Sequence, residues 1–227
     1  AGEICCIAGI DGNGQTELIY ALTGLEKAVG GKIELCGNDF MNAKVRQRHK
    51  GEMSHIPEDR HKHGLVLDYT LEENMVLKRY LEPKFQNHGF IKRREVREYS
   101  DELIKEYDVR CGQGSLTVVR QMSGGNQQKV VFAKALLTEP SIWICDEPTQ
   151  AVDVATRQEI HRLLRKEAEK GKAVLYVSSD LTELLEIADE VAVMAYGKVR
   201  KTFENKDLKP ADVLACCYEA EREENDR

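Results

Sequence analysis

Short apolar runs alternate along the chain with segments whose apolar residues recur at helical spacing. Residues 3–8, 142–145 and 173–178 are mostly apolar runs with the length of buried strands. Residues 15–22 and 154–170 place apolar side chains on one face of a helix. Buried strands that alternate with such helices are typical of an α/β domain with a mostly parallel, covered sheet.

Two segments predict β-hairpins. Residues 31–36 alternate between apolar and polar side chains and end in the turn-forming pair Gly37-Asn38. Residues 191–195 and 198–203 flank Tyr196-Gly197 in the same way. These hairpins predict a small antiparallel β portion beside the parallel sheet. The basic cluster within residues 41–50 predicts a solvated helix or loop face.

The composition changes in the middle of the chain. Between about residues 61 and 120 charges are dense and helical spacing dominates, with the clearest helices at 71–81 and 95–107. We therefore predict that residues 1–60 and 121–227 form one core and that residues 61–120 form an inserted helical subdomain. The chain begins at Ala1 and reaches an apolar run within three residues, so we expect it to be one domain of a longer polypeptide.

Charge and apolar content exclude several classes of protein. The chain has 33 Lys and Arg against 39 Asp and Glu, a net charge of -6, which argues against a dedicated nucleic-acid binder. No stretch approaches the roughly 18 apolar residues that a membrane span needs. We expect a soluble chain whose contact with a membrane comes through a partner.

The cysteines predict free thiols in a reducing compartment. There are seven, an odd number, and none is arranged as Cys-x-x-Cys, so paired disulfides and zinc knuckles fit poorly. Cys145 lies inside an apolar run and is predicted to be a core residue rather than a nucleophile.

The turn after the first apolar run has the spacing of a phosphate-binding loop. Gly9 and Gly14 hold the outer glycines of the pattern G-x-x-x-x-G-K-[ST], and a helix is predicted to follow. Backbone N–H groups of such a loop, together with the N-terminus of the helix, bind phosphate. The candidate nucleotide-binding residues are Gly9, Gly12, Asn13, Gly14, Gln15 and Thr16.

Gln15 occupies the position of the lysine in that pattern. An amide can donate a hydrogen bond to phosphate, but it supplies no positive charge. Thr16 stands where a hydroxyl would ligate Mg²⁺. Taken alone, the segment is equally compatible with an ordinary tight turn.

Acidic residues follow the second apolar run. The strand predicted over 142–145 would carry Asp146 to the carboxyl edge of the sheet, where it can hold Mg²⁺. Glu147 would then orient or deprotonate an attacking water. The alternative is an acidic strand end that caps the following helix.

A second potential anion site lies further upstream. Ser123-Gly124-Gly125 comes before a polar helix start, so the serine is a candidate N-cap with exposed backbone donors beside it. The alternative is an ordinary helix cap.

In this order, the motifs resemble those of ABC-type ATPases. The segment of Ser123, Gly124, Gly125, Asn126 and Gln127, upstream of Asp146 and Glu147, is similar to the signature of that family. Residues 148–153 resemble its D-loop, residues 177–180 its H-loop and residues 57–59 its Q-loop. The resemblance covers essentially the whole chain and implies a P-loop NTPase (RecA-like) core.

The resemblance also implies roles for single residues, with ATP and Mg²⁺ as cofactors. It assigns catalysis to Glu147 and Ser179, nucleotide binding to Glu58 and Asp153, and Mg²⁺ ligation to Thr16 and Asp146. Three positions depart from the family pattern: Gln15 replaces a lysine, Glu58 a glutamine and Ser179 a histidine.

Family dimers hold each ATP between the phosphate loop of one domain and the signature of the other. We therefore hypothesise an asymmetric pair of sites. The phosphate loop of this chain would form a weak or slow site, and its signature would complete a competent site on the partner domain.

Three further segments narrow the resemblance. Residues 56–60, 64–67 and 73–74 are similar to the second ATP-binding domain of importers for simple sugars, in which two such domains are fused. Residues 58–67 resemble the nucleoside-importing branch most closely. This implies a peripheral position at the cytoplasmic face of the cell membrane. It also implies a second ATP-binding domain and permease subunits as partners, with a solute-binding protein as an indirect one and no nucleic acid.

Two other functions remain open. A non-transport ABC ATPase is disfavoured because the segment between Gly14 and Ser123 shows no sustained heptad repeat. A non-catalytic nucleotide-binding regulatory module is favoured by Gln15 and Ser179, and disfavoured by Glu147.

Overall fold

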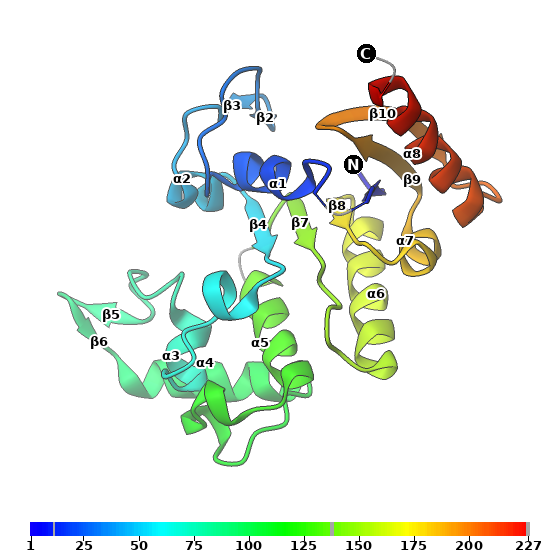
Figure 1. Cartoon of the computed structure of the whole chain (residues 1–227). Coiled ribbons are helices and arrows are strands. Elements are labelled where there is room, and N and C mark those ends of the chain that lie inside the picture. Colours follow the sequence, from blue (N-terminus) through cyan, green and yellow to red (C-terminus); the bar gives the residue numbers. More distant parts are fainter. Residues whose placement is uncertain (11, 137–138, 226–227) are drawn as a thin grey trace. The chain divides into compact units, whose positions relative to one another are not determined.

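The computed structural model describes residues 1–10, 12–136 and 139–225, which are arranged in two compact units (Figure 1). The first unit consists of Ala1–Glu58, Pro140–Pro148 and Gln158–Arg227, and the second of Asp59–Glu139 and Thr149–Arg157. The second unit therefore extends beyond the helical segment 61–120 that the sequence predicts.

The first unit is built on a six-stranded sheet with the strand order β10-β9-β1-β8-β7-β4. The strands are β1 (Ile4–Ala8), β4 (Met53–Ile56), β7 (Ile142–Asp146), β8 (Ala173–Val177), β9 (Glu190–Ala195) and β10 (Lys198–Glu204). All neighbouring strands are parallel except β10, which forms an antiparallel hairpin with β9. The predicted α/β class with a mostly parallel sheet is thus confirmed.

One part of the core of this unit lies between the sheet and helix α1 (Gln15–Thr23). Ile19 is fully buried and belongs to one apolar cluster with Ile7, Ile144 and Val177, which come from three parallel strands. Complete burial of one such aliphatic side chain stabilises a fold by about 2 kcal/mol. Cys145 on β7 is also fully buried, which confirms its prediction as a core residue.

The remaining elements of the first unit are short, apart from two helices. They are β2 (Glu34–Leu35), β3 (Asn38–Asp39), α2 (Val45–Lys50), α6 (Val154–Glu169), α7 (Leu181–Ile187) and α8 (Pro210–Asn225). The strands β2 and β3 pair as the hairpin predicted around Gly37. The first turn of α6, up to Arg157, belongs to the second unit.

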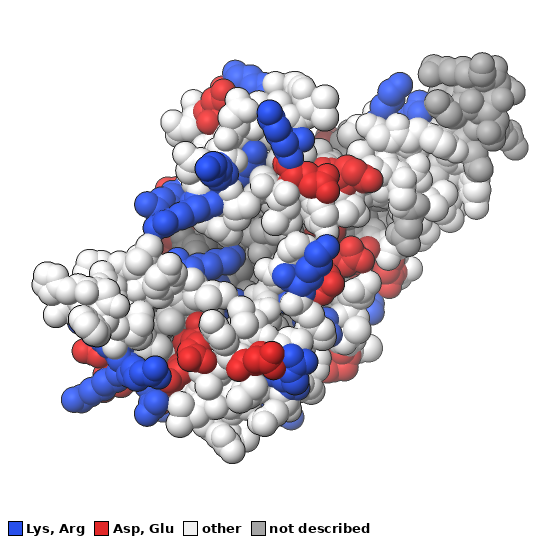
Figure 2. All heavy atoms as spheres, turned by 60° about the vertical axis from the view of Figure 1, so that its left-hand side comes forward, with Lys and Arg blue, Asp and Glu red and all other residues white. Residues whose placement is uncertain are grey.

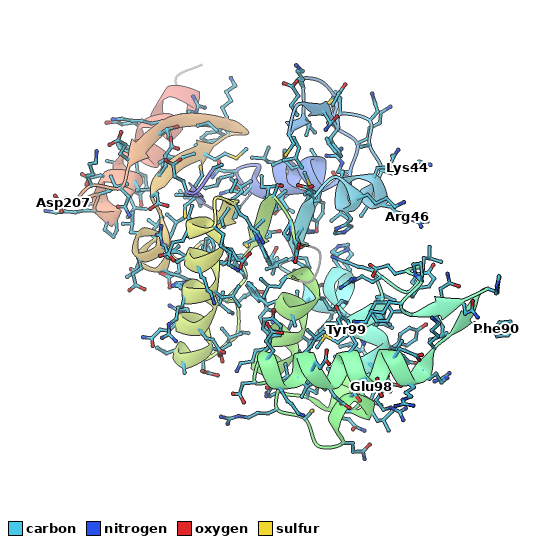
Figure 3. The ribbon with its side chains drawn as sticks, turned by 180° about the vertical axis from the view of Figure 1, so that it is seen from behind. Lys44, Arg46, Phe90, Glu98, Tyr99 and Asp207 are labelled. Carbon is cyan, nitrogen blue, oxygen red and sulfur yellow. The ribbon has the colours of Figure 1, made fainter. Side chains whose placement is uncertain are left out.

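The basic segment around α2 differs in one residue from the predicted solvated face. Lys44 and Arg46 are exposed and project outward, as Figure 3 shows. Arg48 is buried, because its guanidinium donates hydrogen bonds to the carbonyl oxygens of Ala43, at 2.9 Å, and Leu22, at 2.5 Å. It ties α2 to the end of α1.

The second unit is mainly helical. Its longer helices are α3 (Leu71–Val76), α4 (Arg93–Glu106) and α5 (Gly124–Leu136), joined by the single turns η1 (Arg60–Gly64), η2 (Gly114–Leu116) and η3 (Val119–Gln121). The buried side chains of α4, Val96, Tyr99, Ser100 and Leu103, follow the period of an amphipathic helix. The ring centroids of Tyr99 and Phe85 lie 4.9 Å apart in the core of this unit.

The helix predicted over 71–81 is shorter in the structure. It ends at Val76, and the next residues form turns closed by i+3 hydrogen bonds from Arg79 to Val76 and from Glu82 to Arg79. A hairpin of β5 (Gln86–Asn87) and β6 (Phe90–Ile91) follows, which the sequence analysis misses. Figure 3 shows Phe90 projecting from its end, where the residue is 80% exposed.

Two features bear on the possible partners of this chain: the distribution of charge on its surface, and the length and apolar content of its helices. Acidic and basic side chains are interspersed on the face drawn in Figure 2, so neither unit shows a surface of one sign there. Across the described residues, no helix is both long enough and apolar enough to cross a bilayer.

Lys134 on α5 generates a prediction about stability. It is 5% exposed, and its ammonium donates a 2.7 Å hydrogen bond to the carbonyl oxygen of Gly64. Burial, with repulsion from the nearby Lys78, lowers the pKa of Lys134 from 10.5 to about 7. Between these two values the unfolded chain binds a proton that the folded chain lacks, so the free energy of unfolding rises with pH.

We expect Lys134→Met to remove this rise. The difference in unfolding free energy between wild type and variant should grow by on the order of 1 kcal/mol per pH unit above about pH 7. Urea unfolding at several pH values measures it, with Lys105→Met on the exposed face of α4 as the control. A difference that does not change with pH would contradict the prediction.

Candidate functional site

The predicted site residues of the first unit gather at one edge of its sheet. Because β1, β8, β7 and β4 are parallel, their carboxyl ends meet at the same edge. The phosphate loop follows β1, Ser179 follows β8, and Glu58 follows β4. Asp146 ends β7, and Glu147 is the next residue.

Asn13 fastens the phosphate loop to the β9–β10 turn. Its side-chain oxygen accepts a 2.7 Å hydrogen bond from the backbone N–H of Tyr196, and its carbonyl oxygen accepts one of 2.9 Å from Gly197. Its side-chain amide donates to the carbonyl oxygen of Ile10 at 2.9 Å. Residue 11 of the loop lies outside the described residues.

Gly14 is the N-cap of α1 and has φ 102°, in the left-handed region. A Cβ there would lie 3.0 Å from the Cα of Gly197, so the loop and the turn can approach this closely only with glycine at position 14. Thr16, in the first turn of α1, is exposed.

Gln15 is turned into its own loop. It is 8% exposed, and its side-chain amide donates a 3.1 Å hydrogen bond to the carbonyl oxygen of Ile10. A Cβ at Gly9 would lie only 2.3 Å from the nitrogen of this amide. The amide therefore lies directly against Gly9, and the position brings a hydrogen-bond donor but no charge to the loop.

Asp146 is a buried carboxylate among other carboxylates. It is 4% exposed and accepts a hydrogen bond from the backbone N–H of Glu58. Burial and the negative charges of Glu58 and Glu147 raise the pKa of Asp146 to about 7. A cation at this edge would offset that accumulated negative charge.

Glu147 is held in a defined orientation. Its backbone has φ 43°, rare outside glycine, and its N–H donates to the carbonyl oxygen of Val177 at 3.0 Å. Its carboxylate accepts hydrogen bonds from the backbone N–H of Ser179, at 2.5 Å, and from the hydroxyl of Ser178, at 3.4 Å.

Burial is the main cause that raises the pKa of Glu147, and the charges of Glu183 and Glu58 add to it. Hydrogen bonds from Ser179 oppose the rise. A carboxylate with a raised pKa accepts a proton more readily, which suits a general base.

The signature segment lies in the second unit, at the start of α5. The hydroxyl of Ser123 accepts hydrogen bonds from the Asn126 backbone N–H, at 3.5 Å, and from its side-chain amide, at 2.9 Å. Gln127 is buried, donates to the carbonyl oxygen of Val119 at 3.1 Å, and lies 2.9 Å from Nε2 of His61. His61 therefore contacts the signature.

Gly124 and Gly125 lie against the segment that resembles the D-loop. A Cβ at Gly124 would be 3.0 Å from the guanidinium of Arg60, which itself donates to the carbonyl oxygen of Gln150 at 3.2 Å. A Cβ at Gly125 would be 3.6 Å from the carboxylate of Asp153.

Asp153 caps the start of α6. Its carboxylate accepts hydrogen bonds from the backbone N–H of Thr156, at 2.9 Å, and from its hydroxyl, at 3.1 Å. These bonds lower the pKa of Asp153. In the structure, Asp153 therefore serves as a helix cap beside the signature.

The first unit also contains a cluster of polar side chains that the sequence pattern does not predict. His161, Tyr176 and Glu183 come from α6, β8 and α7, and their side chains meet by hydrogen bonds next to the Glu147 segment. The only signal in the sequence is a glutamate three residues after Asp180, in a helix that is otherwise apolar on its buried side.

The structure has a Gly-rich loop between its first strand and first helix, beside an acidic strand end on a parallel sheet. This arrangement is typical of nucleotide-binding folds, in which such a loop holds phosphate. The profile of the ABC transporter family matches residues 1–150, so the chain belongs to that family.

The chain is similar to several curated import proteins. It is 41% identical over 200 residues to the nucleoside import ATP-binding protein NupA of Lactococcus lactis subsp. cremoris, covering 88% of this chain and 39% of that protein. It is 41% identical over 199 residues to the guanosine import ATP-binding protein NupO of Bacillus subtilis, with coverage of 88% and 39%. The ribose import ATP-binding protein RbsA 2 of Rubrobacter xylanophilus is 35% identical over 214 residues, with coverage of 94% and 41%. The chain therefore spans about two-fifths of the length of these relatives.

Solved structures agree on the fold. The ATP-binding cassette MJ0796, in a dimeric post-hydrolysis state bound to ADP and Pi, superposes with a TM-score of 0.75 at 24% identity, covering 90% of this chain and 86% of that one. The ADP conformation of the cassette MJ1267 gives a TM-score of 0.74 at 18% identity, with coverage of 95% and 87%. The predicted P-loop NTPase fold is thus confirmed.

The close packing of the phosphate loop can be tested at its first glycine. In Gly9→Ala the new Cβ would lie 2.5 Å from the carbonyl oxygen of Met194, so we expect the backbone to shift and unfolding free energy to fall by at least ~2 kcal/mol. Gly12→Ala is the matched control, since open space surrounds that position and only its φ of 84° costs about 1–2 kcal/mol. Equal losses in urea unfolding, with equal nucleotide affinity, would contradict the packing described.

Proposed function

We propose that this chain is the ATP-binding domain of an ABC importer that uses ATP hydrolysis to drive uptake of a nucleoside or simple sugar. The observation that carries the hydrolytic part is the Glu147 carboxylate, held by the Ser179 N–H at the sheet edge beside the phosphate loop. The import proteins similar to this chain support the transport part.

The nucleotide phosphates would bind at the loop of Gly9, Gly12, Asn13, Gly14, Gln15 and Thr16. Backbone N–H groups and the N-terminus of α1 supply the donors there. Glu58 and Asp153 are carried over from the resemblance as further nucleotide-contacting residues.

The donor set fits Mg²⁺. Thr16 and Asp146 offer hydroxyl and carboxylate oxygens, the hard ligands that this ion prefers. The described residues contain no group of three or more His, Cys, Asp and Glu side chains able to hold a metal. When bound, Mg²⁺ would neutralise negative charge on the phosphates, while Asp146 holds the ion at the sheet edge.

Glu147 would orient the attacking water and accept its proton. Its raised pKa and its bond to Ser179 suit that role. Ser179 would act through its N–H, which orients Glu147, at the position where the family has a histidine.

The phosphate loop and the signature of this chain would contribute to two different ATP sites. Because Gln15 supplies no charge, the phosphate loop of this chain forms a weak or slow site. The signature residues Ser123, Gly124, Gly125, Asn126 and Gln127 would complete the site on a second ATP-binding domain, fused upstream.

The partners follow from this arrangement. Permease subunits would receive the movement, a solute-binding protein would act indirectly, and the domain would lie peripherally at the cytoplasmic face of the membrane. The second candidate is a regulatory nucleotide-binding module, favoured by the hydrogen bond of Gln15 to its own loop.

Restoring the charge at position 15 tests the weak site. We expect Gln15→Lys to tighten Mg-ATP binding about tenfold or more, since a charged contact contributes roughly 1.5–3 kcal/mol. Isothermal titration calorimetry on the chain measures it. Gln158→Lys, which adds the same charge on the exposed side of α6, is the control. Equal affinities for wild type and Gln15→Lys would show that the amide already suffices.

The role of the signature is tested in the fused protein. Ser123→Arg places a bulky cation at the start of α5, where we expect it to block the partner's ATP and abolish transport-coupled hydrolysis. The assay is ATP turnover in the reconstituted transporter. Arg120→Ser, which changes an exposed side chain upstream of the signature, serves as the control. Wild-type turnover in Ser123→Arg would rule out the proposed role.

A further inference from the structure

A buried polar cluster lies beside the segment that holds Glu147. Tyr176, fully buried on β8, donates its hydroxyl hydrogen to Oε1 of Glu183 on α7. Nε2 of His161, on α6, lies 2.9 Å from the same oxygen and 3.3 Å from the Tyr176 hydroxyl. The side chain of Glu183 is 3% exposed. A carboxylate is thus kept in the core by two polar groups from different elements.

A continuous chain of hydrogen bonds leads from this cluster to Glu147. The N–H of Glu183 donates to the side chain of Asp180 at 3.1 Å, and the N–H of Asp180 donates to the hydroxyl of Ser178 at 3.2 Å. That hydroxyl and the N–H of Ser179 both donate to the Glu147 carboxylate.

The segment 178–180 is therefore fixed at two ends. One end continues β8, whose Tyr176 reaches Glu183. The other end starts α7, whose first turn is capped by Asp180 and carries Glu183. Burying a carboxylate costs several kcal/mol unless it is paired and hydrogen-bonded, and a fully satisfied buried network rigidifies the segments that it joins.

We propose that Glu183 is a positioning residue, which His161 and Tyr176 hold in the core so that residues 178–180 present their donors to Glu147 in one fixed geometry. This inference rests on the catalytic role proposed for Glu147. Other charged groups that face Glu147 are Asp146 and Glu58, from β7 and the end of β4.

Hydrogen exchange of the Ser179 amide tests the network without any assay of turnover. In Glu183→Ala we expect this amide to exchange at least about tenfold faster, relative to the amides of β8, because its segment opens locally. Glu183→Gln keeps an acceptor oxygen for Tyr176 and should restore most of the protection.

A second buried glutamate provides the matched control. Glu167 on α6 is 4% exposed and pairs with Lys170 at 2.5 Å and with Lys172. Glu167→Ala should lower overall stability but leave the Ser179 amide as protected, relative to β8, as in wild type. If Glu183→Ala behaves like Glu167→Ala, the proposal is overturned.

Kinetics of the assembled transporter complete the test. The quantity to compare is the Glu147-dependent turnover, which is the part of the total ATP turnover that Glu147→Gln removes. Glu183→Ala should lower the kcat of this part about tenfold with little change in KM for ATP, Glu183→Gln should recover most of it, and Glu167→Ala should change neither. Unchanged kcat in Glu183→Ala overturns the proposal. Normal turnover in Glu147→Gln would overturn the function proposed for Glu147, whereas the exchange result would still report on the network.

Discussion

The structure depends on holding three carboxylates, Glu58, Asp146 and Glu147, at one edge of a parallel sheet. Parallel pairing brings the ends of β4 and β7 together, and the burial of Asp146 removes much of the water that would screen its charge from those of Glu58 and Glu147. The raised pKa of Asp146, about 7, expresses this cost. A cation at this edge would offset the negative charge, which supports the metal–nucleotide site that we propose.

The phosphate loop, by contrast, lacks the positive charge that a lysine at position 15 would supply. Its backbone donors and helix N-terminus attract phosphate, but Gln15 adds no charge and hydrogen-bonds to the loop itself. Incoming phosphates would have to compete with the bond to Ile10, or leave it in place and rely on backbone groups alone. Either way, the loop loses the strongest single contact that a lysine would provide. This is the physical basis for the asymmetric pair of sites that we propose.

Much of the first unit could be predicted from the sequence because its strands are continuous apolar runs. β1, β7 and β8 are confirmed in this way, as are α1 and α6. Strand β4 was missed because its four residues include Ser54 and His55, which break the apolar pattern. Its strand character comes from pairing with β7, a contact distant in sequence.

Side-chain geometry was the least predictable level. Arg48 lies in a basic cluster whose pattern indicates a solvated face. In the structure it is buried, and its guanidinium donates hydrogen bonds to carbonyl oxygens of two segments. The helix after Thr70 ends at Val76, and in the following turns Arg79 donates hydrogen bonds to Glu82 and Tyr99 through its side chain. The meeting of His161 with Glu183 depends on the packing of α6 and α7, for which no spacing rule exists.

The most direct test is Mg-ATP binding and hydrolysis by this chain, alone and in the fused protein that we propose, with Glu147→Gln as the variant. We expect the variant to retain the wild-type affinity for Mg-ATP and to lose the hydrolysis that depends on this chain. Hydrolysis by Glu147→Gln at the wild-type rate would contradict the role proposed for Glu147, because this residue would then neither orient the attacking water nor accept its proton.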